Sequence, residues 1–429
     1  MIGIYMFITA LVLLLVGFPV AFAFGSAAIF TAFFAPDVGI EVFNLLPFRI
    51  YGIMQNFNLI AVPLFIFMGL ILEKSKIAEA MLLSIGKLFG SVRGGLAIST
   101  VLVGAVLAAS TGIVGASVVM MSVISLPIMI NHGYSKSLAS GTIAASGTLG
   151  QIVPPSIVLI ILGDVMSVDV GSLFRAALAP ALLLIGLYVL YILIISYLNP
   201  HIAPAIVNDN VNKKELILSA LKAIIPPAIL IMIVLGSIFM GVATPTESAA
   251  FGAIGAILLT LLNRSFTFAT LQYASMETVK MTSMIFMILI GATAFSLVFN
   301  ESGGADMVLE FFSEDIADKW TFIAIAMIAI FILGFFVDFL EITFIVIPIL
   351  VPILAHFGID PVWFAILIAI NLQASFLTPP FGFALFYLKG AAGDQVSTGD
   401  IYRGVIPFIG LQLLALGILM LFPEIVKIF

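Results

Sequence analysis

The chain contains no cysteine and very little charge. Its 429 residues include three His, two Trp and only 9% charged residues. A soluble domain carries about 25% charged residues, because these cover its surface. The low charge therefore excludes a soluble enzyme, a nucleic-acid-binding protein and a disordered protein. The absence of cysteine excludes disulfides and thiolate metal sites, and the three histidines are too few and too scattered for a metal cluster.

Apolar residues dominate the chain instead. They make up 63% of it, with 38 Phe, 36 Gly and 20 Pro, and the mean hydropathy is +1.31. Gly and Pro are more frequent in membrane helices than in soluble ones. Apolar stretches of the ~20 residues that cross a bilayer recur from about 3–35 to 402–425. We therefore expect an all-α polytopic membrane protein. The first stretch lacks a basic leader and is interpreted as a membrane segment, not a signal peptide.

An internal repeat defines the expected organisation. Four residues recur 225 positions later, as Pro127/Pro352, Gly133/Gly358, Pro154/Pro379 and Pro155/Pro380. The sequence thus predicts a first repeat over 1–200, a polar connector over 201–214 and a second repeat over 215–429. Duplicated halves with Gly/Pro-interrupted segments are typical of secondary transporters, whose site lies at the repeat interface. Channels also use repeats, so a channel remains an alternative.

Each half contains an apolar stretch too long for one membrane helix. Residues 94–130 carry no charge and would form a helix of about 55 Å, whereas the hydrocarbon core is about 30 Å thick. The small residues around Ser110, Thr111 and Gly112 indicate a re-entrant hairpin that turns inside the membrane; a helix-packing face is the alternative. The counterpart over 320–355 places Asp338 and Glu341 in an apolar run. Intramembrane carboxylates usually mark a functional site, unless this turn reaches the aqueous edge. Glu341 is a candidate cap for the second arm.

A proline pair interrupts the next helix of each half, predicted over 138–163 and 361–388. Two prolines remove two backbone donors, so the helix is expected to open. The freed carbonyls and nearby hydroxyls suit sodium, and the N-terminal amides of the following half-helix suit a carboxylate. Simple proline kinks are the alternative. The polar residues around the two breaks are the candidate ligands: Ser146, Thr148, Ser156, Asn371, Gln373, Ser375 and Thr378.

Other segments are predicted to have structural roles. Gly241–Gly252 begins a helix that Thr244 or Thr246 caps, with Glu247 favourably placed near its N-terminus; a substrate role for Glu247 is the less favoured reading. Glu73–Arg93 and Glu301–Trp320 have the pattern of amphipathic helices. The positive-inside rule places the basic regions Lys74–Arg93 and Lys213–Lys222 in the cytoplasm. Neither an ATPase motif nor a hydrolase grouping accompanies them, so we expect no enzyme activity.

The motifs GTLGQIVPPS, GVATPTESAAFG and NLQASFLTPPFG closely resemble the large membrane (M) subunit of tripartite ATP-independent periplasmic (TRAP) transporters. The resemblance covers essentially the whole chain. It implies two inverted repeats forming an elevator-type scaffold and transport domain, as a multi-pass protein of the bacterial inner membrane. Sodium would be the coupling ion, without an organic cofactor. The implied partners are a small four-helix membrane subunit, a periplasmic substrate-binding protein, the lipid bilayer and an organic acid of the C4-dicarboxylate or sialic acid type, but no nucleic acid.

The resemblance also implies specific ligands. Sodium sites would lie where each hairpin tip meets the broken helix of its own half, at Ser110, Gly112, Ser146, Thr148, Asp338, Ser375 and Thr378. The substrate carboxylate would lie near Ser110, Thr111, Ser156, Pro379 and Pro380. Three alternatives remain open: proton coupling through Asp338 and Glu341, a passive anion channel, and a structural membrane subunit.

Overall fold

The protein is described by a computed structural model that covers residues 2–35, 38–112, 114–205, 213–312 and 318–429. The side chains of Ala78, Ser110, Thr111 and Lys213 lie outside this description. All regular structure in these ranges is helical, and eight of the described helices are long and apolar enough to cross a membrane. The prediction of an all-α polytopic membrane protein is therefore confirmed.

The chain begins with an antiparallel helix pair and a long membrane helix. The turn between the first two helices is at Gly17, whose φ of +97° favours glycine. Asn56 caps the fourth helix by accepting a hydrogen bond from the Asn58 amide at 3.0 Å. The elements of this region are α1 (Ile2–Val16), α2 (Val20–Phe34), η1 (Ile40–Leu45), α3 (Leu46–Met54), α4 (Phe57–Lys74) and the amphipathic α5 (Ile77–Leu88).

Two helices occupy the region expected to form the first hairpin. Helix α6 (Gly95–Thr111) ends at Gly112, which has a φ of +59°, and α7 (Val114–Asn131) packs back along α6. The next helix is interrupted at its proline pair, as predicted. Helix α8 (Lys136–Thr148) passes through η2 (Leu149–Gln151), opens at residues 152–156 and resumes as α9 (Ile157–Val165), and α10 (Val170–Leu198) follows. The Pro154–Pro155 peptide is cis.

The second half begins with long helices and a cap. The Thr244 hydroxyl accepts from the Glu247 amide at 3.3 Å, and the Glu247 carboxylate accepts from the Thr244 amide at 2.8 Å. The predicted structural cap is thus confirmed, with Thr244 as the capping residue. Thr246 instead donates to the Phe57 carbonyl at 2.7 Å and joins α12 to α4. The helices are α11 (Lys213–Phe239), α12 (Pro245–Leu262), α13 (Phe268–Glu301) and α14 (Gly304–Glu310).

The remaining elements follow the order of the first half. The region expected to form the second hairpin contains α15 (Lys319–Leu333), α16 (Phe339–Glu341), the π-helical η4 (Ile342–Val346) and α17 (Ile347–His356). The second interrupted helix is α18 (Pro361–Leu377) and α19 (Phe383–Ala392), separated by a break with a cis Pro379–Pro380 peptide. The chain ends with η5 (Gly393–Gln395), α20 (Thr398–Leu421) and η6 (Pro423–Lys427).

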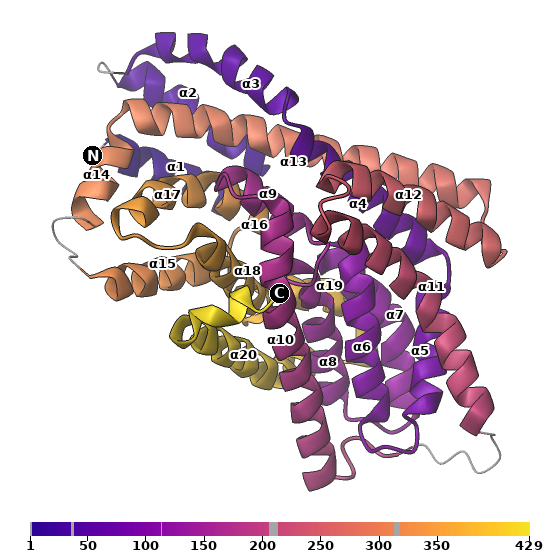
Figure 1. Ribbon diagram of the computed structural model, residues 1–429. Coiled ribbons are helices and arrows are strands. Elements are labelled where there is room, and N and C mark those ends of the chain that lie inside the picture. The colour runs from indigo at the N-terminus through magenta and orange to yellow at the C-terminus, as the bar shows by residue number, and fades with distance from the viewer. Residues whose placement is uncertain (1, 36–37, 113, 206–212, 313–317) are drawn as a thin grey trace.

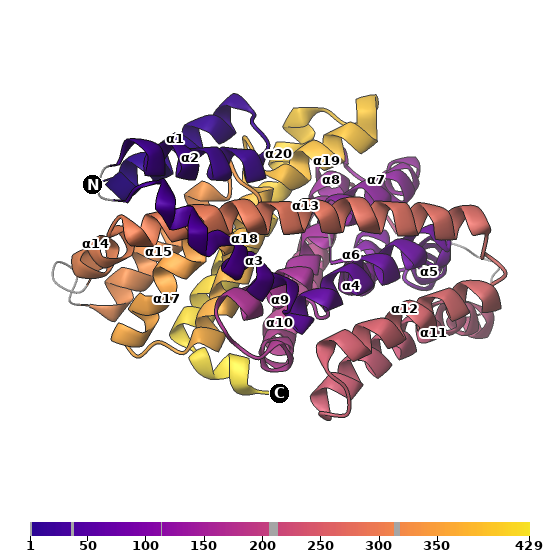
Figure 2. The same ribbon diagram turned by 90° about the horizontal axis from the view of Figure 1, so that it is seen from above.

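The two interrupted helices form the centre of the molecule. All residues from Leu138 to Thr148 in α8 and from Trp363 to Leu377 in α18 are buried. A helix that is buried on all sides must have neighbouring helices packed closely around it. For α8, a Cβ on Gly141 would lie 2.0 Å from the Gly404 carbonyl oxygen. Helices α8 and α20 therefore pack backbone to backbone. The long α13 spans the molecule next to α2 and α4 (Figures 1 and 2). The breaks of α8 and α18 therefore lie next to the core, with hairpin arms around them.

Candidate transport site

The turn of the first hairpin contacts the start of α9. A Cβ on Gly112 would lie 3.2 Å from the Ile157 amide nitrogen and 2.9 Å from its Cγ1. Ile157 follows Ser156 directly, so the hairpin turn and the break of the first interrupted helix touch through their backbones. Only a glycine with a left-handed φ allows this approach. The side chains of Ser110 and Thr111, which we predict as ligands, lie outside the described part of the chain.

The break itself is lined by buried polar groups. Ser156 is fully buried, and its hydroxyl donates to the Gln151 carbonyl at 2.8 Å instead of capping α9. The Gln151 side chain is also fully buried, and neither its nitrogen nor its oxygen has a partner among the described residues. A buried amide without a partner is costly and requires an explanation, for which a bound ligand is one candidate. Gln151 is not among the predicted ligands, although a polar residue in an apolar run is a signal of a functional site.

The second hairpin contacts the other interrupted helix in the same way. A Cβ on Gly334 would lie 2.2 Å from the Ser375 hydroxyl oxygen, and the Phe336 and Phe381 rings are 5.2 Å apart. Ser375 and Thr378 donate their hydroxyl protons to carbonyls one turn earlier, each at 2.8 Å. Their oxygens keep lone pairs for a cation. The Pro380 carbonyl accepts from the Tyr402 hydroxyl at 3.1 Å.

The two carboxylates of the second hairpin have different environments. The Asp338 carboxylate caps α16 and accepts from the Phe339 amide at 2.7 Å. Asp338 is therefore the N-cap residue of this arm. Glu341 follows at the N3 position, from which its carboxyl bonds the Asp338 backbone, so the predicted capping role of Glu341 is a reciprocal one. Glu341 is 4% exposed, and its Oε2 has no partner among the described residues. It borders a cavity of about 10 Å³ that is also lined by Phe7 and Phe24 from α1 and α2.

Two further predicted ligands are directed elsewhere. Ser146 packs against α6 at Gly104, where a Cβ would lie 2.6 Å from the Ser146 Cβ. This contact is two helical turns before Gly112. The Thr148 hydroxyl accepts hydrogen bonds from Gln373 at 3.3 Å and from Gln412 at 3.5 Å. The structure thus brings Gly112 next to Ser156, but it directs Thr148 towards α18 and α20.

The cluster around Thr148 includes residues that the sequence analysis missed. Gln412 in α20 and Tyr188 in α10 are fully buried, and the Tyr188 ring packs edge-on against Phe408 at 5.1 Å. Gln412 interrupts an apolar run, which is the signal that could have identified it. Asn371, which was predicted, donates to the Met327 carbonyl at 2.7 Å and ties α18 to α15.

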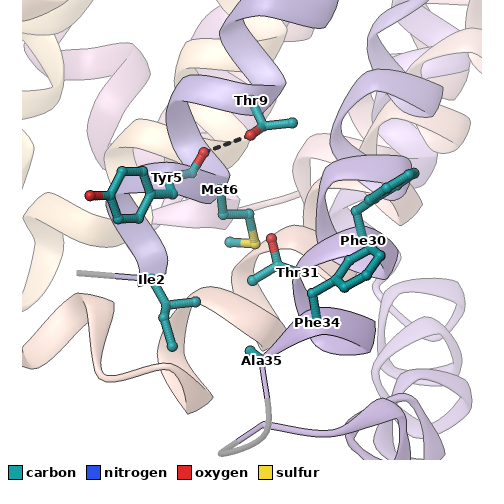
Figure 3. Close-up of a pocket in the computed structure, with 8 residues that line it drawn as sticks. All are labelled: Ile2, Tyr5, Met6, Thr9, Phe30, Thr31, Phe34 and Ala35. Carbon is teal, nitrogen blue, oxygen red and sulfur yellow. Dashed lines mark hydrogen bonds between the residues drawn. The ribbon is translucent and has the colours of Figure 1, made fainter.

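A separate hollow lies between α1 and α2. Its volume is about 330 Å³, and its lining includes Tyr5, Met6, Phe30 and Phe34 (Figure 3). The only hydrogen bond drawn there joins Thr9 to the Tyr5 carbonyl within one helix. None of the candidate ligands lines this hollow.

Hairpins packed against interrupted helices in an all-helical membrane chain are the arrangement of a secondary transport protein. Residues 7–425 match the family model described as "Tripartite ATP-independent periplasmic transporter, DctM component". The chain therefore belongs to this family of transporter permeases and is a multi-pass protein of the inner membrane. The family resemblance seen in the sequence motifs is confirmed.

Relatives in the family carry names with different substrates. The chain is 28% identical to the C4-dicarboxylate TRAP transporter large permease protein DctM of Pseudomonas aeruginosa, over 93% of this chain and 91% of the relative. It is 27% identical to the sialic acid large permease protein SiaM of Vibrio cholerae, over 96% and 94%. It is 28% identical to the ectoine large permease protein TeaC of Halomonas elongata, over 97% and 96%. Similar identities to all three do not select a substrate.

The fold is also found in a solved structure. The Alcanivorax borkumensis YdaH transporter, described as having an unusual topology, superposes with a TM-score of 0.64 over 90% of this chain and 89% of its own. At 16% sequence identity this similarity shows the fold alone.

Proposed function

We propose that this chain is the permease subunit of a sodium-driven importer of an organic acid anion, which a periplasmic binding protein delivers. One observation carries the proposal: in each half, the hairpin turn contacts the interrupted helix of the same half, through Gly112 and Ile157 and through Gly334 and Ser375. Membership of a tripartite family supports the two partners, a small four-helix membrane subunit and the binding protein.

The proposed coupling ions bind at these two contacts. An opened helix supplies carbonyls, and serine and threonine supply hydroxyl oxygens, which are the ligands that coordinate sodium in broken-helix transporters. The first site would use Ser110 and Gly112, without Ser146, which packs against α6 at Gly104. The second would use Asp338, Ser375 and Thr378, and here a carboxylate would offset the charge of the ion. Thr148 is assigned to the interface between the halves instead, since its hydroxyl accepts from Gln373 and Gln412.

The proposed substrate site lies between the two ion sites. The start of α9 at Ser156 offers backbone donors that the Ser156 side chain does not cap, and helix N-termini favour carboxylates. The Pro379–Pro380 turn, with Pro380 exposed, would form a second wall of this site. Ser110 and Thr111 remain predicted ligands whose side chains lie outside the described part of the chain. Dicarboxylates, sialic acids and related organic acids share the carboxylate that these groups would bind.

Sodium binding can be tested before the substrate is known. We expect the purified protein to melt at a higher temperature in sodium chloride than in potassium or choline chloride of equal ionic strength. A ligand at a hundredfold excess over Kd stabilises the folded state by about 2.7 kcal/mol. Asp338→Asn should reduce this sodium-specific rise. Asp360→Asn is the matched control, because Asp360 also caps a helix, accepting from the Val362 amide at 2.9 Å, away from the hairpin turn. Equal melting in all three salts would contradict sodium coupling.

Glu341 favours a second candidate, proton coupling. A carboxylate that is 4% exposed and has an unpartnered oxygen among the described residues is costly to bury as an ion. Uptake into proteoliposomes under a pH gradient without sodium separates the two drivers. Uptake that requires sodium and persists in Glu341→Gln would exclude Glu341 as the relay.

A further inference from the structure

A second hollow, separate from the transport site, opens at the end of the molecule where α4 passes into α5. Its volume is about 760 Å³. Three segments line it: the α4–α5 junction, the first half of α11 and the connection between α12 and α13. Figure 2 shows α5 and the α12–α13 connection at the same end of the molecule. None of the hairpin-turn or helix-break residues contributes to its lining.

The lining of this basic pocket carries charge of one sign. Lys74, Lys76, Lys222 and Arg264 border it, and no Asp or Glu is found among the described residues that line it. Lys74 is partly neutralised by Glu73 at 3.5 Å and lies 4.7 Å over the Tyr273 ring. In the described part of the chain, the other three basic residues form no ion pair. Three cations thus share one hollow without a protein counter-ion.

Hydroxyl groups accompany these cations. They come from all three lining segments, and the residues are Ser75, Ser84, Ser219, Ser265, Thr267 and Thr270. The hydroxyls of Ser75, Ser219 and Ser265 donate to backbone carbonyls, and those of Thr267 and Thr270 bond each other. The three unpaired cations are therefore the donors that match the oxygens of a phosphate, which accepts several charge-assisted hydrogen bonds. The ligand that fits is therefore a phosphate group and not a carboxylic acid of the transported kind, for which a single cation or helix terminus suffices.

The surroundings of the basic pocket indicate that this phosphate carries acyl chains. Large apolar side chains are exposed on the adjoining helices: Leu221 and Ile225 of α11, Leu262 of α12 and Phe268 of α13, the last two 79% and 74% exposed. These helices are membrane-span candidates. Apolar surface on a spanning helix faces lipid, and a basic pocket at its end lies at headgroup level. A soluble anion would not need this apolar surround.

We propose that the basic pocket binds the headgroup of an anionic phospholipid from the cytoplasmic leaflet. The lipid links the amphipathic helix α5 to α11 and to the α12–α13 connection, which have no ion pair joining them among the described residues. The side of the membrane follows from the positive-inside rule, since Lys74–Arg93 and Lys213–Lys222 are the most basic regions near this end.

The test is lipid-dependent stability of the full-length protein in detergent. Its melting temperature is measured with added phosphatidylglycerol, cardiolipin or phosphatidylcholine, and with inorganic phosphate alone. The test variant combines Lys76→Gly, Lys222→Gln and Arg264→Gly. Lys76 and Arg264 have φ values of +59° and +54°, so glycine removes the charge without straining the backbone. The control variant is Arg49→Gln with Lys319→Gln and Lys427→Gln, basic residues outside this pocket.

We expect the anionic lipids to raise the melting temperature of the wild type and of the control more than phosphatidylcholine does. In the test variant, lipid affinity should fall about fivefold for each removed charge. An equal rise in the test variant and the control would overturn the proposal. A rise with inorganic phosphate that matches the rise with lipid would also overturn it, because the pocket would then bind a soluble anion.

Discussion

Gln373 donates a hydrogen bond to the Thr148 hydroxyl at 3.3 Å, and the two residues are separated by 225 positions. This is the spacing at which the proline and glycine pattern of the first half recurs in the second. Residues related by the repeat therefore touch each other. A position can contact its own counterpart only near the axis that relates the two halves, so this bond marks the place where α8 and α18 meet.

This contact predicts a large effect from a small substitution. Thr148→Val removes the shared acceptor of the Gln373 and Gln412 amides and leaves both buried. Each unsatisfied buried donor costs about 1–3 kcal/mol, so the melting temperature of the purified protein should fall clearly. The double variant Thr148→Val/Gln373→Leu should lose less stability than the sum of the losses in the two single variants, because both substitutions remove the same bond.

The matched control for this prediction is Thr9→Val. The Thr9 hydroxyl bonds the Tyr5 carbonyl within its own helix on an exposed face, so its loss should cost less than about 0.5 kcal/mol. If the Thr148→Val and Thr9→Val proteins have the same melting temperature, the buried cluster does not join the two halves.

The second hairpin gives a steric prediction. Alanine at Gly334 would place its Cβ 2.2 Å from the Ser375 hydroxyl oxygen, so the hairpin turn must move away from α18. Overpacking of this kind costs about 1–3 kcal/mol. We also expect the sodium-specific rise in melting temperature to be reduced, because the proposed second ion site includes Ser375.

Gly410→Ala separates this effect from the general effect of alanine in a helix. A Cβ on Gly410 meets nothing within 4 Å, so alanine should leave stability unchanged or raise it by up to about 1 kcal/mol. A Gly334→Ala protein that keeps the full sodium-specific rise would argue against an ion site at this contact.

Local chemistry explains what the sequence could predict. The proline pairs predicted the breaks at Pro154–Pro155 and Pro379–Pro380, although a third pair, Pro226–Pro227, lies within the continuous helix α11. Gly112 ends α6 through its own backbone preference, so the turn could also be predicted. The Thr244 cap could also be predicted from the sequence, because Glu247 follows Thr244 at capping-box spacing.

The sequence did not predict which distant helix each side chain faces. The sequence places Ser146 and Thr148 two residues apart on one helix, but it does not tell which neighbour each side chain faces. Ser146 packs on Gly104 and Thr148 on Gln373, and this follows from the tertiary packing of four helices. Gln412 is visible in the sequence as a polar residue in an apolar run, but its partner Thr148 is 264 positions away, so the contact could not be predicted. Whether the hairpin contacts hold sodium stays a prediction.

The Thr244 cap allows a stability test within one motif. Thr244→Ala removes the hydroxyl that accepts from the Glu247 amide, and loss of a helix N-cap costs about 0.5–2 kcal/mol. Thr244→Asp should restore most of the stability, since aspartate is an equally good cap. Thermal melting of the three proteins checks this order, and an aspartate variant no better than alanine would show that capping does not stabilise α12.

The last prediction concerns movement between α4 and α9. The Asn56 amide donates to the Asp164 carboxylate, which lies in the half-helix after the first break. If α9 moves with the hairpins in an elevator-type cycle, while α4 stays with α12 and α13, this bond must break in every cycle. Asp164→Ala removes it and leaves the Asn56 cap on α4 intact. A hydrogen bond contributes about 0.5–1.5 kcal/mol net, so the population of this conformation should fall about two- to tenfold.

Spin labels can measure this shift directly. The chain contains no cysteine, so Val123→Cys on α7 and Leu258→Cys on α12, which are 60% and 53% exposed, introduce a unique labelled pair. Thr246→Val is the control, because it breaks a bond between α12 and α4, which are expected to stay together. We expect Asp164→Ala to redistribute the measured distances and Thr246→Val to leave them unchanged. Identical distance distributions in the two variants would mean that loss of the Asn56–Asp164 bond does not displace α7 from α12, which would contradict the expected elevator-type movement.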